Sequence, residues 1–166
     1  MNAKLQASLR ECALHADILR QGLNDIANSL PFTAAMLASL NPAQRRILDQ
    51  LAYRFTKLQD SLGEKVFPGI LELSAEPLPD HATFMEKLHR LERLQAIPSV
   101  DTWKTLRELR NAIAHEYPDA LEIQAARLNQ FAAGIATLLS CWDAVQRFVA
   151  KVDAVTNTFW DEKKAF

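Results

Sequence analysis

The chain of 166 residues is poor in the residues that break helices or build covalent and metal sites. Only 4 glycines are present, and they form no glycine-rich phosphate loop. The 2 cysteines, Cys12 and Cys141, lie in apolar helical patterns, which indicates small buried thiols rather than a disulfide or a nucleophile. His81 and His89 have no obvious third ligand near them, and no motif with metal-ligand spacing occurs, so we predict no metal and no cofactor.

A large net charge and a long apolar run are also lacking. The formal net charge of −1 gives no overall basic field, so nucleic acid would have to bind a local patch. The amino-terminal segment carries charges at Arg10, Glu11, Asp17 and Arg20, and it therefore lacks the apolar core of a signal peptide. No stretch is apolar enough to span a bilayer. We expect a cytoplasmic protein without membrane contact.

What the chain does contain is typical of a helical globular protein. Apolar residues make up 49% of the sequence and charged residues 23%. The length is sufficient for one compact core without disulfides or metals. We expect a single helical domain over residues 1–166.

Apolar side chains recur at steps of three and four residues, the pattern of helices that pack in a bundle. The first predicted helix carries this stripe over residues 5–30 and is stopped by Pro31. Residues 32–40 form either a short helix or an ordered loop. The run Asn41-Pro42-Ala43-Gln44 is a helix start signal, because Asn caps, Pro suits the first position and Gln completes a capping box.

The second helix follows this signal through Val66, and Pro68-Gly69 should kink or interrupt it before an extension through Leu73. A proline-rich crossing at residues 76–79 then separates two helical pairs. A third, shorter helix is predicted from about Asp80 to Ala96.

The fourth helix begins near Ser99 or Asp101, and Pro118 should end it at residues 115–117. The last helix follows a cap at residues 119–122 and carries its stripe from Leu121 through Val152, with a possible continuation past Val155. Together these elements predict an all-α, up-and-down four-helix bundle with a short accessory helix or loop after the first helix.

The segment that can carry chemistry lies at the predicted end of the fourth helix. Arg110 supplies a permanent guanidinium and His115 a titratable imidazole, with Asn111 and Tyr117 beside them. On an ideal helix, positions five apart differ by about 140°, so Arg110 and His115 need helix termination or a second subunit to converge. Asn111 and His115 share a helix face.

The Arg-x4-His spacing alone is weak, since chance produces it in about one such chain in four. This chain contains it twice. The second copy, Arg10 to His15, lies within the first helix and lacks both the following Asn and the terminating proline. We interpret that copy as coincidence.

A purely structural interpretation of the main segment is also available. In it, Arg110 pairs with an acid, His115 caps its helix against the negative end of the dipole, and Tyr117 packs as a boundary aromatic. The joint occurrence of these residues in this order on the penultimate helix favours a functional interpretation.

The segment Arg110-Asn111-Ala112-Ile113-Ala114-His115-Glu116-Tyr117 resembles the Arg-Asn-x3-His-x-Tyr signature of HepT-like HEPN toxins at every signature position. The run from Tyr53 to Gly63 is similar to the corresponding stretch in a subset of these proteins. The resemblance implies a HEPN-like domain, the toxin of a type VII-like HEPN/MNT toxin–antitoxin pair. It also implies a metal-independent endoribonuclease that forms a homodimer and has an MNT-type nucleotidyltransferase antitoxin as its partner.

The resemblance further implies a role for each signature residue. His115 would accept the proton of the ribose 2′-hydroxyl, and Arg110 would stabilise charge on the phosphoryl oxygens. Asn111 would orient His115 or contact phosphate. Tyr117 would be the residue to which the partner attaches AMP, blocking the RNA site by charge and bulk.

Positive residues recur on the fourth helix at Lys104, Arg107 and Arg110, and they can form a local RNA-binding patch. A solvated helix face explains them equally well, because Glu108 and Glu116 dilute the charge.

Two questions stay open at the level of sequence: whether the second helix contributes to the site, and whether the protein is catalytic. Arg54 and Asp60 are the residues of the second helix that can border the site. The alternative function is that of a non-catalytic helical subunit that binds substrate for a nucleotidyltransferase or regulates it. The intact signature favours the nuclease.

Overall fold

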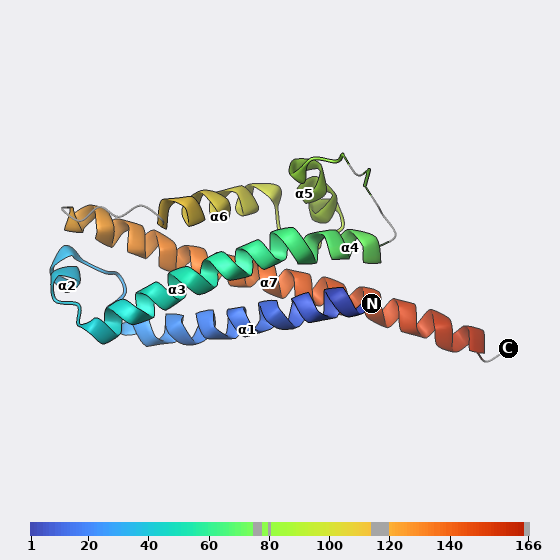
Figure 1. Cartoon of the computed structure of the whole chain (residues 1–166), viewed down its shortest axis with the longest axis horizontal. Helices are drawn as coiled ribbons and strands as arrows, with labels where there is room; N and C mark the ends of the chain where they lie inside the picture. The colour runs from blue at the N-terminus through green and yellow to red at the C-terminus, as the bar shows by residue number, and fades with distance from the viewer. Residues whose placement is uncertain (75–77, 80, 114–119, 165–166) are drawn as a thin grey trace.

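The computed structural model describes residues 1–74, 78–79, 81–113 and 120–164, with side chains for all of these except 112–113 and 155–164. Every regular element in these ranges is a helix, which confirms the predicted all-α class for the described chain. The longest helices are α1 (Ala3–Ile26), α3 (Pro42–Ser61), α6 (Val100–Ile113) and α7 (Leu121–Lys164). They follow one another in alternating directions, and α3 lies between α1 and α6 (Figure 1).

The first helix and its boundary agree with the prediction. Asn2 caps α1, with its Oδ1 accepting a hydrogen bond from the Leu5 N–H at 2.8 Å. The 3-10 turn η1 (Ala27–Ser29) completes this helix before Pro31.

The accessory segment after α1 contains the short helix α2 (Ala34–Ala38), so the helical alternative is the one observed. Asn129 of α7 binds the start of this segment through both ends of its amide. Its Oδ1 accepts from the Phe32 N–H at 2.7 Å, and its Nδ2 donates to the Phe32 carbonyl at 3.0 Å. The segment is therefore tied to the last helix.

The predicted capping box opens α3, since the Asn41 side chain accepts from the Gln44 N–H and Gln44 accepts from the Asn41 N–H. Of the two alternatives predicted at Pro68-Gly69, a kink or an interruption, the interruption is not observed. The chain stays helical through the π-helix η2 (Leu62–Val66) into α4 (Phe67–Leu73), and the Phe67 N–H donates to the carbonyl of Leu62. A wider π turn accommodates the proline, which has no N–H and whose ring would meet the carbonyl four residues earlier in an α-helix.

The third predicted helix is shorter than expected at both ends, because α5 spans Phe84–Arg93. Thr83 and Glu86 form a capping box that sets its start. Its end is set by Gln95, whose φ of 60° cannot continue a right-handed helix, and by the Ala96 N–H, which bonds back to the Leu91 carbonyl at 2.9 Å. α5 crosses the α4 end of the molecule at a steep angle to the long helices (Figure 1).

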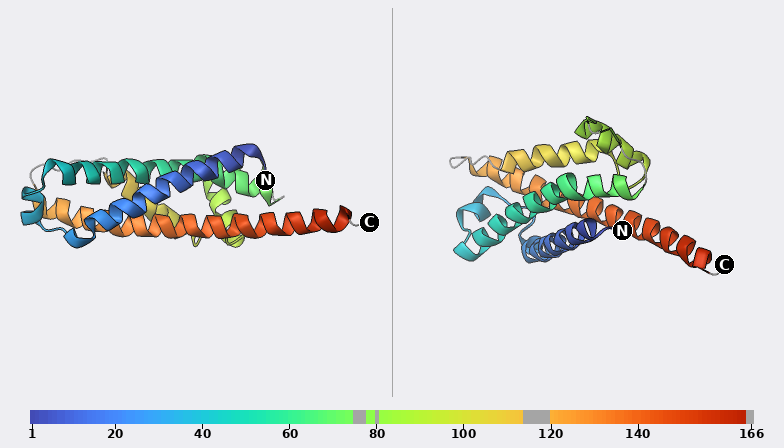
Figure 2. Two further views of the ribbon diagram at one scale, coloured as in Figure 1. Left: turned by 90° about the horizontal axis from the view of Figure 1, so that it is seen from below. Right: turned by 45° about the vertical axis from the view of Figure 1, so that its right-hand side comes forward.

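The start of α6 at Val100 agrees with the prediction, whereas its predicted end at residues 115–117 and the cap at Asp119 lie outside the described residues. So do residues 76–77 of the predicted crossing at residues 76–79. α7 continues past Val155 to Lys164, and Figure 2 shows it extending beyond the amino-terminal end of α1.

The core lies between α1, α3 and α7, with α4, α5 and α6 covering one side of it. Aromatic rings meet in its interior: Phe55 of α3 packs edge-on against Phe131 of α7 with 5.3 Å between ring centroids. Trp142 is 1% exposed. None of the helices described is long and apolar enough to cross a membrane.

Candidate functional site

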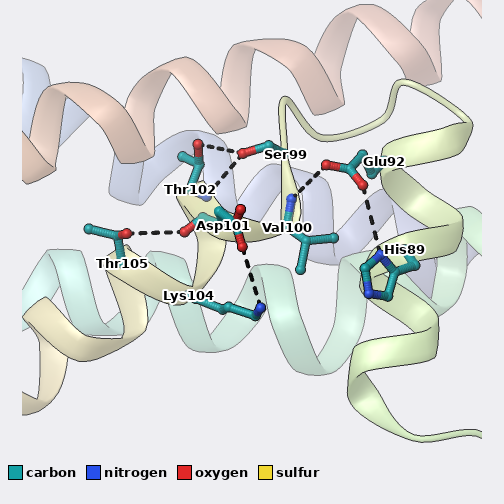
Figure 3. A network of polar contacts seen from close by, with 8 residues as sticks. All are labelled: His89, Glu92, Ser99, Val100, Asp101, Thr102, Lys104 and Thr105. Atoms are coloured by element: carbon teal, nitrogen blue, oxygen red, sulfur yellow. Dashed lines mark hydrogen bonds and ion pairs between the residues drawn. The ribbon is translucent and has the colours of Figure 1, made fainter.

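The amino-terminal end of α6 is fixed by its own cap and by α5. Ser99 Oγ accepts from the Thr102 N–H at 3.0 Å, which is the N-cap bond (Figure 3). Glu92 of α5 reaches across, and its Oε1 accepts from the Val100 N–H at 3.0 Å. The position of α6 is therefore linked to that of α5.

Farther along, α6 packs closely on α7. Gly134 of α7 faces Leu109 of α6, and a Cβ at this glycine would collide with the end of the leucine side chain. The absence of a side chain at Gly134 thus allows the two helices to approach. Trp103 and Leu106 point into the core from the same helix, at 3% and 1% exposure.

A groove of about 480 Å³ lies between the second half of α3, η2, α4, α5 and α6. Arg107 and Arg110 of α6 both line it, so two of the three predicted patch residues border one hollow. The complete lining is Gln59, Asp60, Gly63, Glu64, Pro68, Phe84, Lys87, Trp103, Arg107 and Arg110.

The deeper wall of the groove is made by two aromatic rings and a buried amide. A methyl group added at Gly63 would lie 3.6 Å from Trp103 Cζ2 and 3.7 Å from Phe84 Cζ, so both rings stand beside this glycine. Gln59 is 5% exposed, and its Nε2 is buried with no hydrogen-bond partner among the described residues. A buried donor of this kind costs about 1–3 kcal/mol.

Charge in the groove has a small positive excess. Lys87, Arg107 and Arg110 supply three cations, against the two carboxylates of Asp60 and Glu64. The Arg107 guanidinium lies over the Phe84 ring, 5.8 Å from its centroid, a cation–π arrangement that steadies it at the rim. The groove is therefore a local site of positive charge on a chain whose formal net charge is −1.

Arg110 is held by an acid, as the structural interpretation of the segment anticipated. Its Nη2 donates to Asp60 Oδ1 at 3.2 Å and to Oδ2 at 3.4 Å. The two side chains are 38% and 36% exposed, so the pair contributes at most about 1 kcal/mol to stability. These bonds use one nitrogen of a guanidinium that has five N–H donors, so the group can still bind an anion.

The other predicted site residues are not all brought together. Asn111 is exposed at the end of the described part of α6. His115 and Tyr117 lie outside the described residues, so the convergence of His115 with Arg110 stays a prediction. Lys104 does not line the groove but pairs with Asp101 on its own helix at 3.3 Å.

The second Arg-x4-His copy does not form a site. Arg10 is exposed, whereas His15 is buried between α1 and α3 at 7% exposure. Arg54 Nη1 lies 3.0 Å from His15 Nδ1, and because a guanidinium only donates, this ring nitrogen must accept. Arg54 therefore braces His15 and does not border the groove, in contrast to the sequence-based suggestion.

Burial lowers the pKa of His15 below its usual value, and the positive charge of Arg54 lowers it further. Glu11, whose Oε1 lies 3.9 Å from His15 Nε2, acts in the opposite direction but more weakly. The ring is thus held neutral, with its proton on Nε2. The cluster braces α1 against α3.

The prediction of buried, unreactive thiols is confirmed. Cys12 and Cys141 are 0% and 1% exposed, and burial raises their pKa values to about 12 and about 11. The two histidines interpreted as surface residues, His81 and His89, are exposed. No cluster of metal-ligating side chains occurs in the described ranges.

Sequence reasoning missed most of the groove. Gln59, Phe84 and Lys87 lie on α3 and α5, and no spacing along the chain relates them to the signature on α6. Trp103 carried a signal only as a core residue. The available clue was the stretch from Tyr53 to Gly63 that the sequence analysis singled out, because Gln59, Asp60 and Gly63 of the groove lie in it.

Comparison of the chain with known protein families, with curated proteins and with solved structures found no match. Function is therefore inferred from the signature and the groove beside it.

Proposed function

We propose that this chain is the toxin of a type VII-like HEPN/MNT toxin–antitoxin pair, a metal-independent endoribonuclease built on an up-and-down four-helix bundle of HEPN type. The observation that carries the proposal is the complete signature Arg110-Asn111-x3-His115-x-Tyr117. Its first residue borders a groove with a local excess of positive charge, a feature that RNA binding requires on a chain with no overall basic field.

In the proposed reaction, His115 takes the proton from a ribose 2′-hydroxyl, and the resulting oxygen attacks the adjacent phosphorus. The bond to the 5′-oxygen breaks, which leaves a 2′,3′-cyclic phosphate on one fragment and a 5′-hydroxyl on the other. In a two-fold dimer, the second His115 donates the proton to that leaving oxygen. Both proton transfers use His115 side chains, so the reaction requires no metal ion.

Arg110 is suited to the charge that develops on phosphorus. Asp60 binds one of its terminal nitrogens, which limits the rotamers of the side chain while other N–H groups remain to meet phosphoryl oxygens. A positioned cation in a partly enclosed groove stabilises such a transition state more than one in bulk water. Asn111 would orient His115, since the two positions share a helix face.

The decisive test is cleavage of RNA by the purified full-length protein in the presence of a chelator. The wild type should cut, and His115→Ala and Arg110→Ala should each lose at least about a hundredfold in rate, because each removes a group that acts only in the transition state. His81→Ala and Arg10→Ala are the matched controls, since both side chains are exposed and neither lines the groove. Equal cleavage by His115→Ala would refute the mechanism.

A second candidate function is a non-catalytic subunit that binds substrate for a nucleotidyltransferase or regulates it. The ion pair between Arg110 and Asp60 favours this alternative, because it gives the Arg110 side chain a structural role. Absence of cleavage by every form, across several RNAs, would support this alternative.

Regulation through Tyr117 is tested separately. Mass spectrometry of the chain produced together with an MNT-type nucleotidyltransferase should find AMP on Tyr117, and the modified protein should not cut RNA. Tyr117→Phe should cut RNA and should remain active in the presence of the partner. AMP found only on other residues would remove this part of the proposal.

A further inference from the structure

The groove beside Arg110 contains a feature that cleavage does not need. Gln59 lies in its wall, nine-tenths or more buried, with an amide donor that no described residue satisfies. Amide torsions at the end of a Gln side chain are broad, so a small rotation turns this N–H2 group toward an occupant of the groove. A carbonyl oxygen there would satisfy it.

The remaining lining defines the rest of such an occupant. Trp103 and Phe84 both stand beside Gly63 in this lining, so aromatic ring atoms are available to contact a base. Glu64 lines the same space, and its carboxylate forms no ion pair or hydrogen bond in the described part of the chain. At the rim, Arg107 and Lys87 supply positive charge for an anionic group.

We propose that this groove binds one guanine nucleotide of the RNA substrate and thereby selects where the chain is cut. The inference rests on the proposed ribonuclease function, because it takes RNA as the ligand and Arg110 as the neighbour of the scissile phosphate. Guanine O6 accepts from Gln59, and guanine N1–H and N2–H donate to Glu64. The base lies against Phe84.

Guanine fits this arrangement better than adenine does. Guanine presents a carbonyl oxygen next to two N–H donors along one edge, which matches the donor type of Gln59 and the acceptor type of Glu64, both of which line the groove. Adenine presents an amino donor where guanine has O6, so it would oppose the Gln59 N–H2 with another donor and leave Glu64 without a partner. A pocket of about 480 Å³ is within the range that holds a ligand of nucleotide size.

Binding is measured by calorimetry with guanosine, inosine and adenosine 5′-monophosphates in chelator, using the full-length protein. Guanosine monophosphate should bind about tenfold tighter than adenosine monophosphate, the lower end of what one well-formed base contact discriminates. Inosine monophosphate keeps O6 but lacks the 2-amino group, so its Kd should lie between the two. If it binds as weakly as adenosine monophosphate, the contact between Gln59 and O6 is refuted.

Variants assign the selectivity to named side chains. Gln59→Leu removes the donor at similar volume and should bring the guanosine Kd to that of adenosine, whereas Gln50→Leu, an exposed position on the same helix, should leave both unchanged. Glu64→Gln should weaken guanosine monophosphate most, inosine monophosphate less and adenosine monophosphate not at all, with Glu72→Gln on α4 as its control. Unchanged selectivity in Gln59→Leu would overturn the proposal.

Mapping of RNA ends separates this inference from the proposed function. The wild type should cut next to guanines, and Gln59→Leu should cut with reduced preference for guanine. If RNA is cut without preference and all three nucleotides bind alike, base selection is wrong while the nuclease stands. If guanosine monophosphate binds selectively but no RNA is cut, the nuclease is wrong while the guanine site stands.

Discussion

Replacement of Gln59 should make the protein more stable. The Gln59 side chain is 5% exposed, and its Nε2 has no hydrogen-bond partner in the described part of the chain. Folding therefore removes water from a donor without giving it an acceptor. Gln59→Leu removes the donor, keeps nearly the same volume and adds apolar surface to a groove wall that Gly63 and Trp103 also line.

The size of the effect follows from that one atom. An unsatisfied buried donor costs about 1–3 kcal/mol, and part of this is offset by a slightly different packing of the leucine branch. We expect a net increase of about 1–2 kcal/mol in the free energy of unfolding. For a chain of this size, each kcal/mol raises Tm by about 2–4 °C.

The measurement is urea denaturation followed by circular dichroism, with thermal unfolding as a second readout. The midpoint should rise without a change in the dependence on urea, which would show that the unfolded ensemble is unaltered. Gln50→Leu, on the exposed side of the same helix, should stay within about 0.5 kcal/mol of the wild type. A loss of stability in Gln59→Leu would refute the reasoning, because it would mean that the amide is satisfied in the folded protein.

Three further predictions concern packing and pH. Gly63→Ala should raise the free energy of unfolding by about 0.5–1 kcal/mol, because the added methyl meets its nearest side-chain atom at an ordinary 3.6 Å. Gly22→Ala should lower the free energy of unfolding by about 1 kcal/mol, since the methyl would lie 2.5 Å from Leu51 Cδ2 and 3.0 Å from its Cγ. Denaturation of both variants tests the opposite signs. His15 has a lowered pKa when folded, so the unfolded chain takes up the proton first, and stability should fall as pH drops below the ordinary value of 6.5. His15→Gln, which keeps an acceptor for Arg54, should flatten the Tm profile between about pH 7.5 and 5.5, and an unchanged slope would contradict the assignment.

The sequence predicted helices well where a stripe and a cap coincide. Asn41 and Gln44 located the start of α3 to the residue because a capping box satisfies specific backbone donors. Thr83 and Glu86 form the same kind of capping box. The third helix therefore begins at Phe84, later than the predicted start near Asp80. That helix ends because Gln95 adopts a left-handed backbone conformation. The sequence does not predict this, since residues other than glycine rarely adopt that conformation.

The site could be predicted only in part, for a physical reason. Arg110 and Asn111 are neighbours on one helix, so a local motif identifies them. The groove joins Gln59, Lys87 and Arg107 from three helices, and this proximity arises from packing angles that no linear spacing encodes.

The π-helix η2 resets the rotational phase of the long helical stretch from α3 into α4. Phe55, Leu58 and Leu62 form one buried stripe that ends at the first residue of η2, and Phe67, Ile70 and Leu71 form another after it. In an uninterrupted α-helix the second stripe would be centred about 140° away from the first, because each residue contributes about 100°. The single extra residue in η2 removes about 100° of that offset. Deletion of one residue from Leu62–Val66 would therefore turn the apolar face of α4 away from the core. It would also displace Pro68 from the lining of the groove.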